Sequence, residues 1–214
     1  MLRGRLTLFV HPLVLLTYFV SFPAGGKVPP EHLRLVLLGG ALTGKSSTGN
    51  TILGGNVLDV NRTIEKRTKR CVISHGVVEN RRLIVVDAPG WFYIHSLHDT
   101  SEMDKLEMES SHLCPPGPHA VLLVIDLTTA IGPASLRGIQ EHMSLFGEVI
   151  WKHTIVLFTL GDWLGGKTVE EHIECDEGLR WVVNKCGNRY HAHCRALPNF
   201  CNFTLRLKWT ILVF

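Results

Sequence analysis

The octet at residues 39–46, G-G-A-L-T-G-K-S, constrains this 214-residue chain more than any other feature. It is a complete G-x-x-x-x-G-K-[ST] phosphate-binding loop between an apolar run, 35–38, and a helix-compatible stretch. Its glycines let consecutive backbone N–H groups surround phosphate oxygens at a helix N-terminus. Lys45 would serve the β- and γ-phosphates, and the Ser46 hydroxyl a Mg²⁺ ion. The octet predicts a nucleotide ligand; the alternative is a glycine-rich turn with a solvated lysine.

Short apolar runs alternate with helical patterns beyond the loop, which is typical of parallel strands joined by crossover helices. The expected strands are residues 33–38, 71–78, 83–87, 120–126 and 154–159. The last two are apolar on both faces, as central parallel strands require. The pattern predicts an α/β fold of the P-loop NTPase type: a three-layer sandwich with a mostly parallel sheet and helices on both faces.

Two helices are expected in the second half of the chain. The first carries a stripe of apolar residues at helical spacing, ended by Gly147; its members are Leu136, Ile139, Met143 and Phe146. In the second, Thr168 and Glu171 form a capping box that opens one helix through Trp181 to near Gly187. The apolar stripe is interpreted as core packing.

Composition suits one globular domain with short appendages, at 45% hydrophobic residues and a net charge of +3. Basic residues are scattered, so no nucleic-acid partner is expected, and the densest group is interpreted as a solvated loop or strand edge: Lys66, Arg67, Lys69 and Arg70. Six cysteines without a C-x-x-C pair indicate reduced thiols in a cytoplasmic protein. One group could hold a metal, although structural roles are favoured because its spacing fits no usual zinc site: Cys186, His191, His193 and Cys194.

The N-terminus conflicts with a simple cytoplasmic assignment. Residues 6–22 contain no Asp, Glu, Lys or Arg, and their length falls between a signal-peptide core and a minimal membrane span. We favour a membrane-anchoring or ill-defined leader over secretion, because secretion would remove a nucleotide-binding domain from its ligand pool. Residues 1–30 are thus expected to be leader and linker.

Besides the Ser46 hydroxyl, a carboxylate that helps to hold Mg²⁺ is expected at the end of a neighbouring strand. The D-x-x-G motif at residues 87–90 supplies it. Asp87 would hold Mg²⁺ through water, and the Gly90 amide would contact the γ-phosphate. Between loop and carboxylate, a GTPase places a threonine that reaches the metal. Thr68 and Thr63 are both available, and Thr68 is preferred because it lies nearer the second strand.

Base selection is predicted from T-L-G-D at residues 159–162, an [NT]-x-x-D pattern. The Asp162 carboxylate can accept from the N1 and exocyclic amine hydrogens of guanine, whereas adenine offers no matching pair of donors. The alternative is that Asp162 only starts a turn or helix before Trp163.

Four segments together resemble the immunity-associated GTPase (GIMAP) family, with its AIG-type G domain: residues 39–55, 117–126, 153–162 and 186–190. The resemblance covers about residues 33–192. It implies a guanine-nucleotide-dependent switch and assembly module akin to septin-like GTPases, cytosolic or at organelle membranes, linked to lymphocyte survival and immune responses. It also implies GTP or GDP with Mg²⁺ as cofactors, self-association through the G domain, and membrane contact through the leader as an option.

Roles carried over by position form three groups. The phosphate site would comprise Gly39, Gly40, Ala41, Leu42, Thr43, Gly44, Lys45, Ser46 and Ser47. Thr68 would be the first switch residue, with Asp87 and Gly90 in the second, and the metal would be held by Ser46, Thr68 and Asp87. The base would be read by Thr159, Leu160, Gly161 and Asp162.

The chain departs from the family pattern in several places. Cys194 and Arg195 stand where a second base-reading asparagine is usual, and Leu160 and Gly161 replace a basic residue that packs on the base. Trp91 stands where many GTPases carry a water-orienting glutamine, so slow hydrolysis is expected, accelerated only by a partner subunit.

The C-terminal segment also departs from the pattern. The G domain is expected over 31–194, and 195–214 forms an atypical tail that alternates like a strand where a closing helix is expected, so the fold would be incomplete there. The favoured function is a GTP-binding switch with slow hydrolysis. The alternatives are a nucleotide-incompetent scaffold and an ATP-using phosphotransferase.

Overall fold

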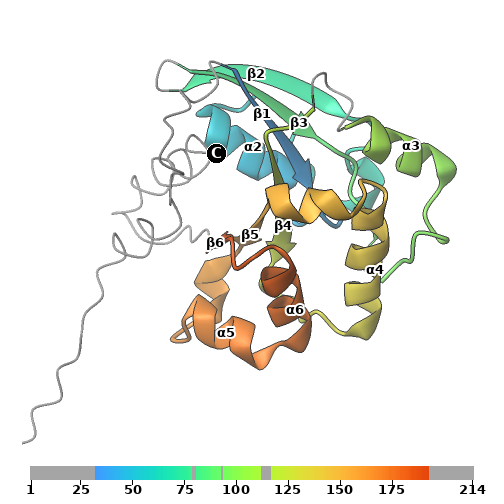
Figure 1. Ribbon diagram of the computed structural model, residues 1–214. Helices are drawn as coiled ribbons and strands as arrows, with labels where there is room; N and C mark the ends of the chain where they lie inside the picture. Colours follow the sequence, from blue (N-terminus) through green and yellow to red (C-terminus); the bar gives the residue numbers. More distant parts are fainter. Residues whose placement is uncertain (1–31, 79–80, 93, 112–116, 193–214) are drawn as a thin grey trace, which may run out of the picture.

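The computed structural model describes residues 32–78, 81–92, 94–111 and 117–192, which form a six-stranded sheet with helices on both faces (Figure 1). The strands are β1 (His32–Leu38), β2 (Val72–Val78), β3 (Arg81–Asp87), β4 (Ala120–Asp126), β5 (Thr154–Thr159) and β6 (Tyr190–Ala192). The α-helices are α2 (Lys45–Leu53), α3 (Glu102–Ser110), α4 (Pro133–Ser144), α5 (Val169–Cys175) and α6 (Glu177–Lys185). Three 3₁₀ turns are η1 (Ile64–Lys66), η2 (Glu148–His153) and η3 (Gly161–Leu164).

The strand order is β2-β3-β1-β4-β5-β6, and all neighbours are parallel except β2 and β3. In the middle of the sheet, Leu35 lies beside Val85 of β3 on one side and Ala120 of β4 on the other. The expected α/β fold with a mostly parallel sheet is confirmed. The sequence pattern did not predict that β2 would be an antiparallel edge strand beside β3, and it did not predict the short β6.

Two apolar clusters separate the layers, because alternate residues of each strand point to opposite faces. On one face, α3, α4, α5 and α6 pack against the sheet around Val36, Leu123 and Phe158, all at most 1% exposed. On the other, Ile52 of α2 packs against strand residues such as Leu37 and Val85. Figure 1 shows α2 on the opposite side of the sheet from α4 and α6. The phosphate-binding loop lies where β1 joins α2, between these layers.

The predicted helices are present with one correction. The capping box of Thr168 and Glu171 is confirmed, with both reciprocal bonds formed. The single helix expected from it is wrong, because the chain leaves helical geometry at Asp176 (φ −115°, ψ 109°) and restarts as α6. The Asp176 carboxylate caps α6 by accepting from the Leu179 N–H at 2.9 Å, and it also accepts from the Ile131 N–H at 2.8 Å.

Several sequence expectations lie outside the described residues: the leader and linker at 1–30, the positions Cys194 and Arg195, and the tail at 195–214. Within the described part of the chain, no helix is long and apolar enough to cross a membrane.

Candidate functional site: a phosphate-binding cavity

The loop after β1 folds back on itself so that α2 begins at Lys45. Gly44 precedes that helix with φ +94°, a left-handed conformation that glycine adopts without a Cβ clash. Its carbonyl accepts the first helical hydrogen bond from the Thr48 N–H at 2.8 Å. The backbone N–H groups at the start of α2 therefore have no helical partner and are available to phosphate oxygens.

The Lys45 ammonium is buried against the loop that precedes it. Its Nζ donates to the Gly40 carbonyl at 2.8 Å and to the Gly39 carbonyl at 3.2 Å. Burial lowers the pKa of Lys45 to about 8, against the raising effect of Asp87 and with a further lowering by Arg67. A polyanion placed beside this nitrogen would favour its charged form.

Ser46 in the first turn of α2 meets Asp87 at the end of β3. The Ser46 hydroxyl donates to Asp87 Oδ2 at 2.6 Å, and Asp87 is 1% exposed. Burial raises the pKa of Asp87, while the Lys45 charge and the nearby Ser46 and Thr68 hydroxyls lower it. Among the described residues, nothing donates a hydrogen bond to the buried Asp87 Oδ1. This pair of hard oxygen groups with an unsatisfied oxygen fits a small divalent cation such as Mg²⁺.

Gly90 closes the D-x-x-G segment against the phosphate-binding loop. A Cβ at this position would lie 2.6 Å from both the Ala41 nitrogen and Lys45 Nζ, so only glycine allows the approach. One residue further on, the Trp91 carbonyl accepts from the Ala41 N–H at 2.6 Å. The second predicted motif is therefore attached directly to the first.

Thr159 attaches the third motif to the same loop. Its hydroxyl donates to the Thr43 carbonyl at 2.8 Å, and its Cγ2 would be 3.3 Å from a Cβ on Gly44. Leu160 follows in a left-handed conformation with φ +57°, and Gly161 and Asp162 open η3. Thr159 thus positions the phosphate-binding loop, a structural role that the [NT]-x-x-D pattern did not predict.

A cavity of about 460 Å³ opens over these motifs, a volume suited to a nucleotide-sized ligand. Its lining residues are Ala41, Leu42, Thr43, Gly44, Lys45, Ser46, Ser47, Thr48, Thr51, Val60, Asn61, Arg62, Arg67, Thr68, Gly90, Thr159 and Leu160. Five of the predicted site residues do not line the cavity: Gly39, Gly40, Asp87, Gly161 and Asp162. Thr68 lines the cavity, whereas the alternative Thr63 is exposed before η1 and does not.

Two sequence interpretations change with the geometry. The prediction that the basic cluster is solvated was wrong for Arg67. Its side chain is only 12% exposed and lines the cavity. Trp91 follows the D-x-x-G motif as expected, but its indole is 3% exposed and packs on α4, away from the cavity. Arg67, Asn61 and Arg62 were missed as cavity residues because nothing in their spacing distinguishes a lining residue from a loop residue.

Of the four-residue cysteine and histidine group, the structure describes Cys186 and His191. Cys186 is the C-cap residue of α6 and is buried in the core, and burial raises its pKa to about 12, which keeps it a thiol. His191 lies in β6, and His193 and Cys194 lie outside the described residues. Among described residues, no three His, Cys, Asp or Glu side chains gather as metal ligands.

The fold and the cavity define a P-loop nucleotide-binding protein of the α/β class. Toc33 from Arabidopsis thaliana, solved with Mg²⁺ and GMPPNP, superposes with a TM-score of 0.63 at 19% identity, over 86% of this chain and 84% of that chain. Era from Aquifex aeolicus, bound to GDP and AlF4⁻, gives a TM-score of 0.53 at 19% identity, over 75% of this chain and 50% of that one. At these identities the likeness shows the fold alone.

Sequence comparison identifies the family. Residues 33–195 match the profile of the AIG1 family. Immune-associated nucleotide-binding protein 1 of Arabidopsis thaliana is 32% identical over 73% of this chain and 71% of its own length. GTPase IMAP family member 8 of Rattus norvegicus is 33% identical over 78% of this chain, but the chain spans only 23% of that protein. The chain belongs to the AIG1 family, which confirms the resemblance seen in its motifs.

Proposed function

We propose that this chain is a guanine-nucleotide-binding switch of the AIG1 type, which binds GTP or GDP with Mg²⁺ and hydrolyses GTP slowly. The observation that carries the proposal is the meeting of Lys45, Ser46 and Asp87 at a cavity lined by loop backbone. The loop N–H groups and the Lys45 ammonium bind the phosphates. Asp162 reads the guanine from η3.

Mg²⁺ would be held by Ser46 and Thr68, with Asp87 behind them. When bound, the ion neutralises charge between the β- and γ-phosphates. The unsatisfied, buried Asp87 Oδ1 and the adjacent hydroxyls support this assignment. A solved relative by fold, Toc33, is described in complex with GDP and Mg²⁺.

Slow hydrolysis follows from what faces the cavity. Among the described lining residues there is no Gln, Glu or His to orient an attacking water. Trp91 cannot do so because its indole is buried against α4. Faster turnover would need a group from a second subunit. Dimerization is described as important for the GTPase activity of Toc33 and Toc159, and we propose self-association here as well. Cytoplasmic localisation and membrane contact through residues 6–22 stay predictions.

Equilibrium binding of GDP, GTP and ATP to the full chain with Mg²⁺ tests the nucleotide assignment. We expect GDP and GTP to bind, ATP to bind far more weakly, and Lys45→Ala to remove binding. Lys152→Ala, an exposed lysine of η2, is the matched control and should bind normally. Binding of ATP alone would favour a phosphotransferase, and binding of no nucleotide would favour a scaffold.

Single-turnover GTP hydrolysis at increasing protein concentration tests the proposal that hydrolysis is slow and is accelerated by self-association. We expect a slow rate in dilute protein that rises with concentration as subunits associate. Rapid hydrolysis by dilute, monomeric protein would contradict this part of the proposal.

A further inference from the structure

Arg67 connects three separate segments at the rim of the phosphate cavity. Its Nη2 forms an ion pair with Asp104 of α3 at 2.8 Å, and its Nη1 donates to the Thr68 carbonyl at 3.3 Å. The guanidinium also lies over the Phe92 ring, 5.2 Å from the centroid. The pair is largely withdrawn from water, with side-chain exposures of 12% for Arg67 and 16% for Asp104. Arg67 thereby joins the segment before β2, the segment after D-x-x-G, and α3.

The same side chain lines the phosphate cavity. Arg67 lines the cavity together with Lys45, Thr68 and Gly90, the residues assigned to the γ-phosphate side. Its charge reaches Lys45, whose pKa it helps to lower. Two cations thus face one cavity and repel each other until an anion enters between them.

A guanidinium can exchange a carboxylate for a phosphate without rebuilding the site. It carries five N–H donors in a planar fork that matches both groups, and it stays charged at any working pH. The terminal phosphate of GTP carries more negative charge than one carboxylate, and charge-assisted bonds to it are strong. GDP places no phosphate at that position.

We propose that Arg67 distinguishes GTP from GDP, exchanging its partner Asp104 for the terminal phosphate when the triphosphate binds. Asp104 then acts as a competitor that holds Arg67 in the diphosphate or nucleotide-free arrangement. Because Thr68 adjoins Arg67, the exchange moves the expected metal-binding threonine and frees the N-terminal turn of α3 together. This inference rests on the proposed guanine-nucleotide binding and assigns its state-sensing residue.

The ratio of GDP to GTP dissociation constants, measured with a non-hydrolysable GTP analogue and Mg²⁺, tests the proposal in the full chain. Arg67→Ala should weaken binding of the GTP analogue by about tenfold to a hundredfold, the range for one charge-assisted contact. It should change the affinity for GDP by less than about twofold. Arg67→Lys should recover only part of this loss, because an ammonium lacks the fork. Asp104→Asn should have the opposite effect and increase the affinity for the GTP analogue several-fold.

Glu102→Gln is the matched control for Asp104→Asn, since it removes another carboxylate from the first turn of α3, where Glu102 pairs with Lys105 instead of Arg67. It should leave both affinities unchanged. Equal weakening of GDP and the GTP analogue by Arg67→Ala would show a merely structural role and overturn the inference. Loss of triphosphate affinity in Asp104→Asn would also overturn the inference. The Asp104→Asn measurement tests it even if Arg67→Ala does not fold. A wild-type chain that binds neither nucleotide would refute the proposed function itself.

Discussion

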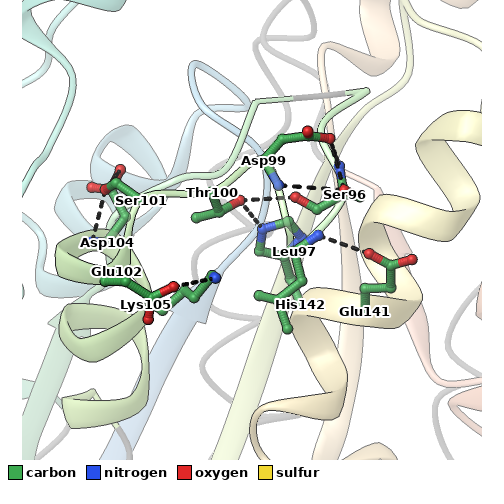
Figure 2. Close-up of polar contacts among 10 residues, drawn as sticks. All are labelled: Ser96, Leu97, Asp99, Thr100, Ser101, Glu102, Asp104, Lys105, Glu141 and His142. Atoms are coloured by element: carbon green, nitrogen blue, oxygen red, sulfur yellow. Dashed lines mark hydrogen bonds and ion pairs between the residues drawn. The ribbon is translucent and has the colours of Figure 1, made fainter.

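The Trp91 indole lies flat on the His142 imidazole, with ring centroids 4.8 Å apart and planes inclined by 12°. His142 is fully buried in α4, where its Nδ1 lies 2.7 Å from the Gly138 carbonyl. Its Nε2 lies 2.7 Å from the Thr100 hydroxyl (Figure 2). Because a carbonyl only accepts, Nδ1 carries the proton, and Nε2 of the neutral ring accepts from Thr100. The segment after the D-x-x-G motif is therefore attached to α4 through a neutral histidine.

The folded protein should lose stability as pH falls below the ordinary histidine range. Burial lowers the pKa of His142 below 6.5, opposed by the Gly138 carbonyl and Glu141 and assisted by Lys105 and His95. The unfolded chain therefore takes up this proton first, so the stabilisation is full above pH 6.5 and declines as pH falls through that value towards the folded pKa. Urea unfolding between pH 7.5 and 5 should show the decline.

Replacement of His142 isolates its contribution to the pH dependence of the free energy of unfolding. His142→Gln should lower stability at pH 7.5 but flatten the pH dependence, whereas His153→Gln, an exposed histidine of η2, should leave the slope unchanged. His119, whose pKa burial also lowers, contributes a slope of the same sign and should be measured separately. An unaltered slope in His142→Gln would contradict the assignment.

Thr159→Val should weaken nucleotide binding by loosening the phosphate-binding loop. Valine keeps the methyl group beside Gly44 but removes the hydroxyl that donates to the Thr43 carbonyl, leaving that acceptor unsatisfied at a cost of about 1–3 kcal/mol. Thr154→Val is matched, because it also removes a buried threonine hydroxyl, one bonded to the Ile150 carbonyl in a residue that does not line the cavity. Both should lower the thermal midpoint, and only Thr159→Val should reduce the gain in midpoint on adding GDP and Mg²⁺.

Patterns that carry both a chemical and a conformational requirement were predictable from sequence. The loop at 39–46 needs glycine where φ is positive, as at Gly44, and an apolar strand before it. The strands β4 and β5 matched their predicted bounds because their uninterrupted apolar runs, 120–125 and 155–158, fit strands buried on both faces.

Features that depend on tertiary partners were not predictable. Strand direction is not encoded in a two-residue period, so the sequence did not indicate which strand of the mostly parallel sheet, β2, would be antiparallel. The break at Asp176 contains no proline and is stabilised by capping and by the distant Ile131 N–H. Arg67 is indistinguishable in sequence from its solvated neighbours, because Asp104, 37 residues away, decides its burial.

Gly90→Ala should remove nucleotide binding through steric conflict alone. Its new methyl group would lie 2.6 Å from the Ala41 nitrogen and from Lys45 Nζ, and since one neighbour is backbone the two motifs must separate. Gly166→Ala adds the same methyl group in open space and is the matched control. Calorimetric titration with GDP should show no heat of binding for Gly90→Ala and wild-type behaviour for Gly166→Ala. Normal affinity in Gly90→Ala would mean that the D-x-x-G segment does not contribute to the site.

Nucleotide affinity should fall as pH rises above about 8. Lys45 has a pKa of about 8 in the free protein, so above that value a bound polyphosphate must restore its proton, and the dissociation constant rises by up to about tenfold per pH unit. Fluorescence titration with a labelled GDP from pH 7 to 9.5 measures the slope. Lys45→Arg keeps its charge throughout and should bind without this pH dependence if it binds at all. A flat wild-type profile would place the functional charge elsewhere.

Asp162→Asn should change which purine the protein accepts. The carboxylate can accept from both the N1 and amine hydrogens of guanine, while an amide presents one acceptor and one donor group. Xanthine carries an oxygen where guanine carries the amine, so it complements the amide better. We expect the affinity for GDP to fall by about tenfold to a hundredfold, which corresponds to about 1–3 kcal/mol for a mismatched polar contact. XDP should bind to the variant more tightly than to the wild type. Competition between GDP and XDP in equilibrium dialysis measures both. Equal preference in the variant and the wild type would show that Asp162 does not read the base and only opens the η3 turn.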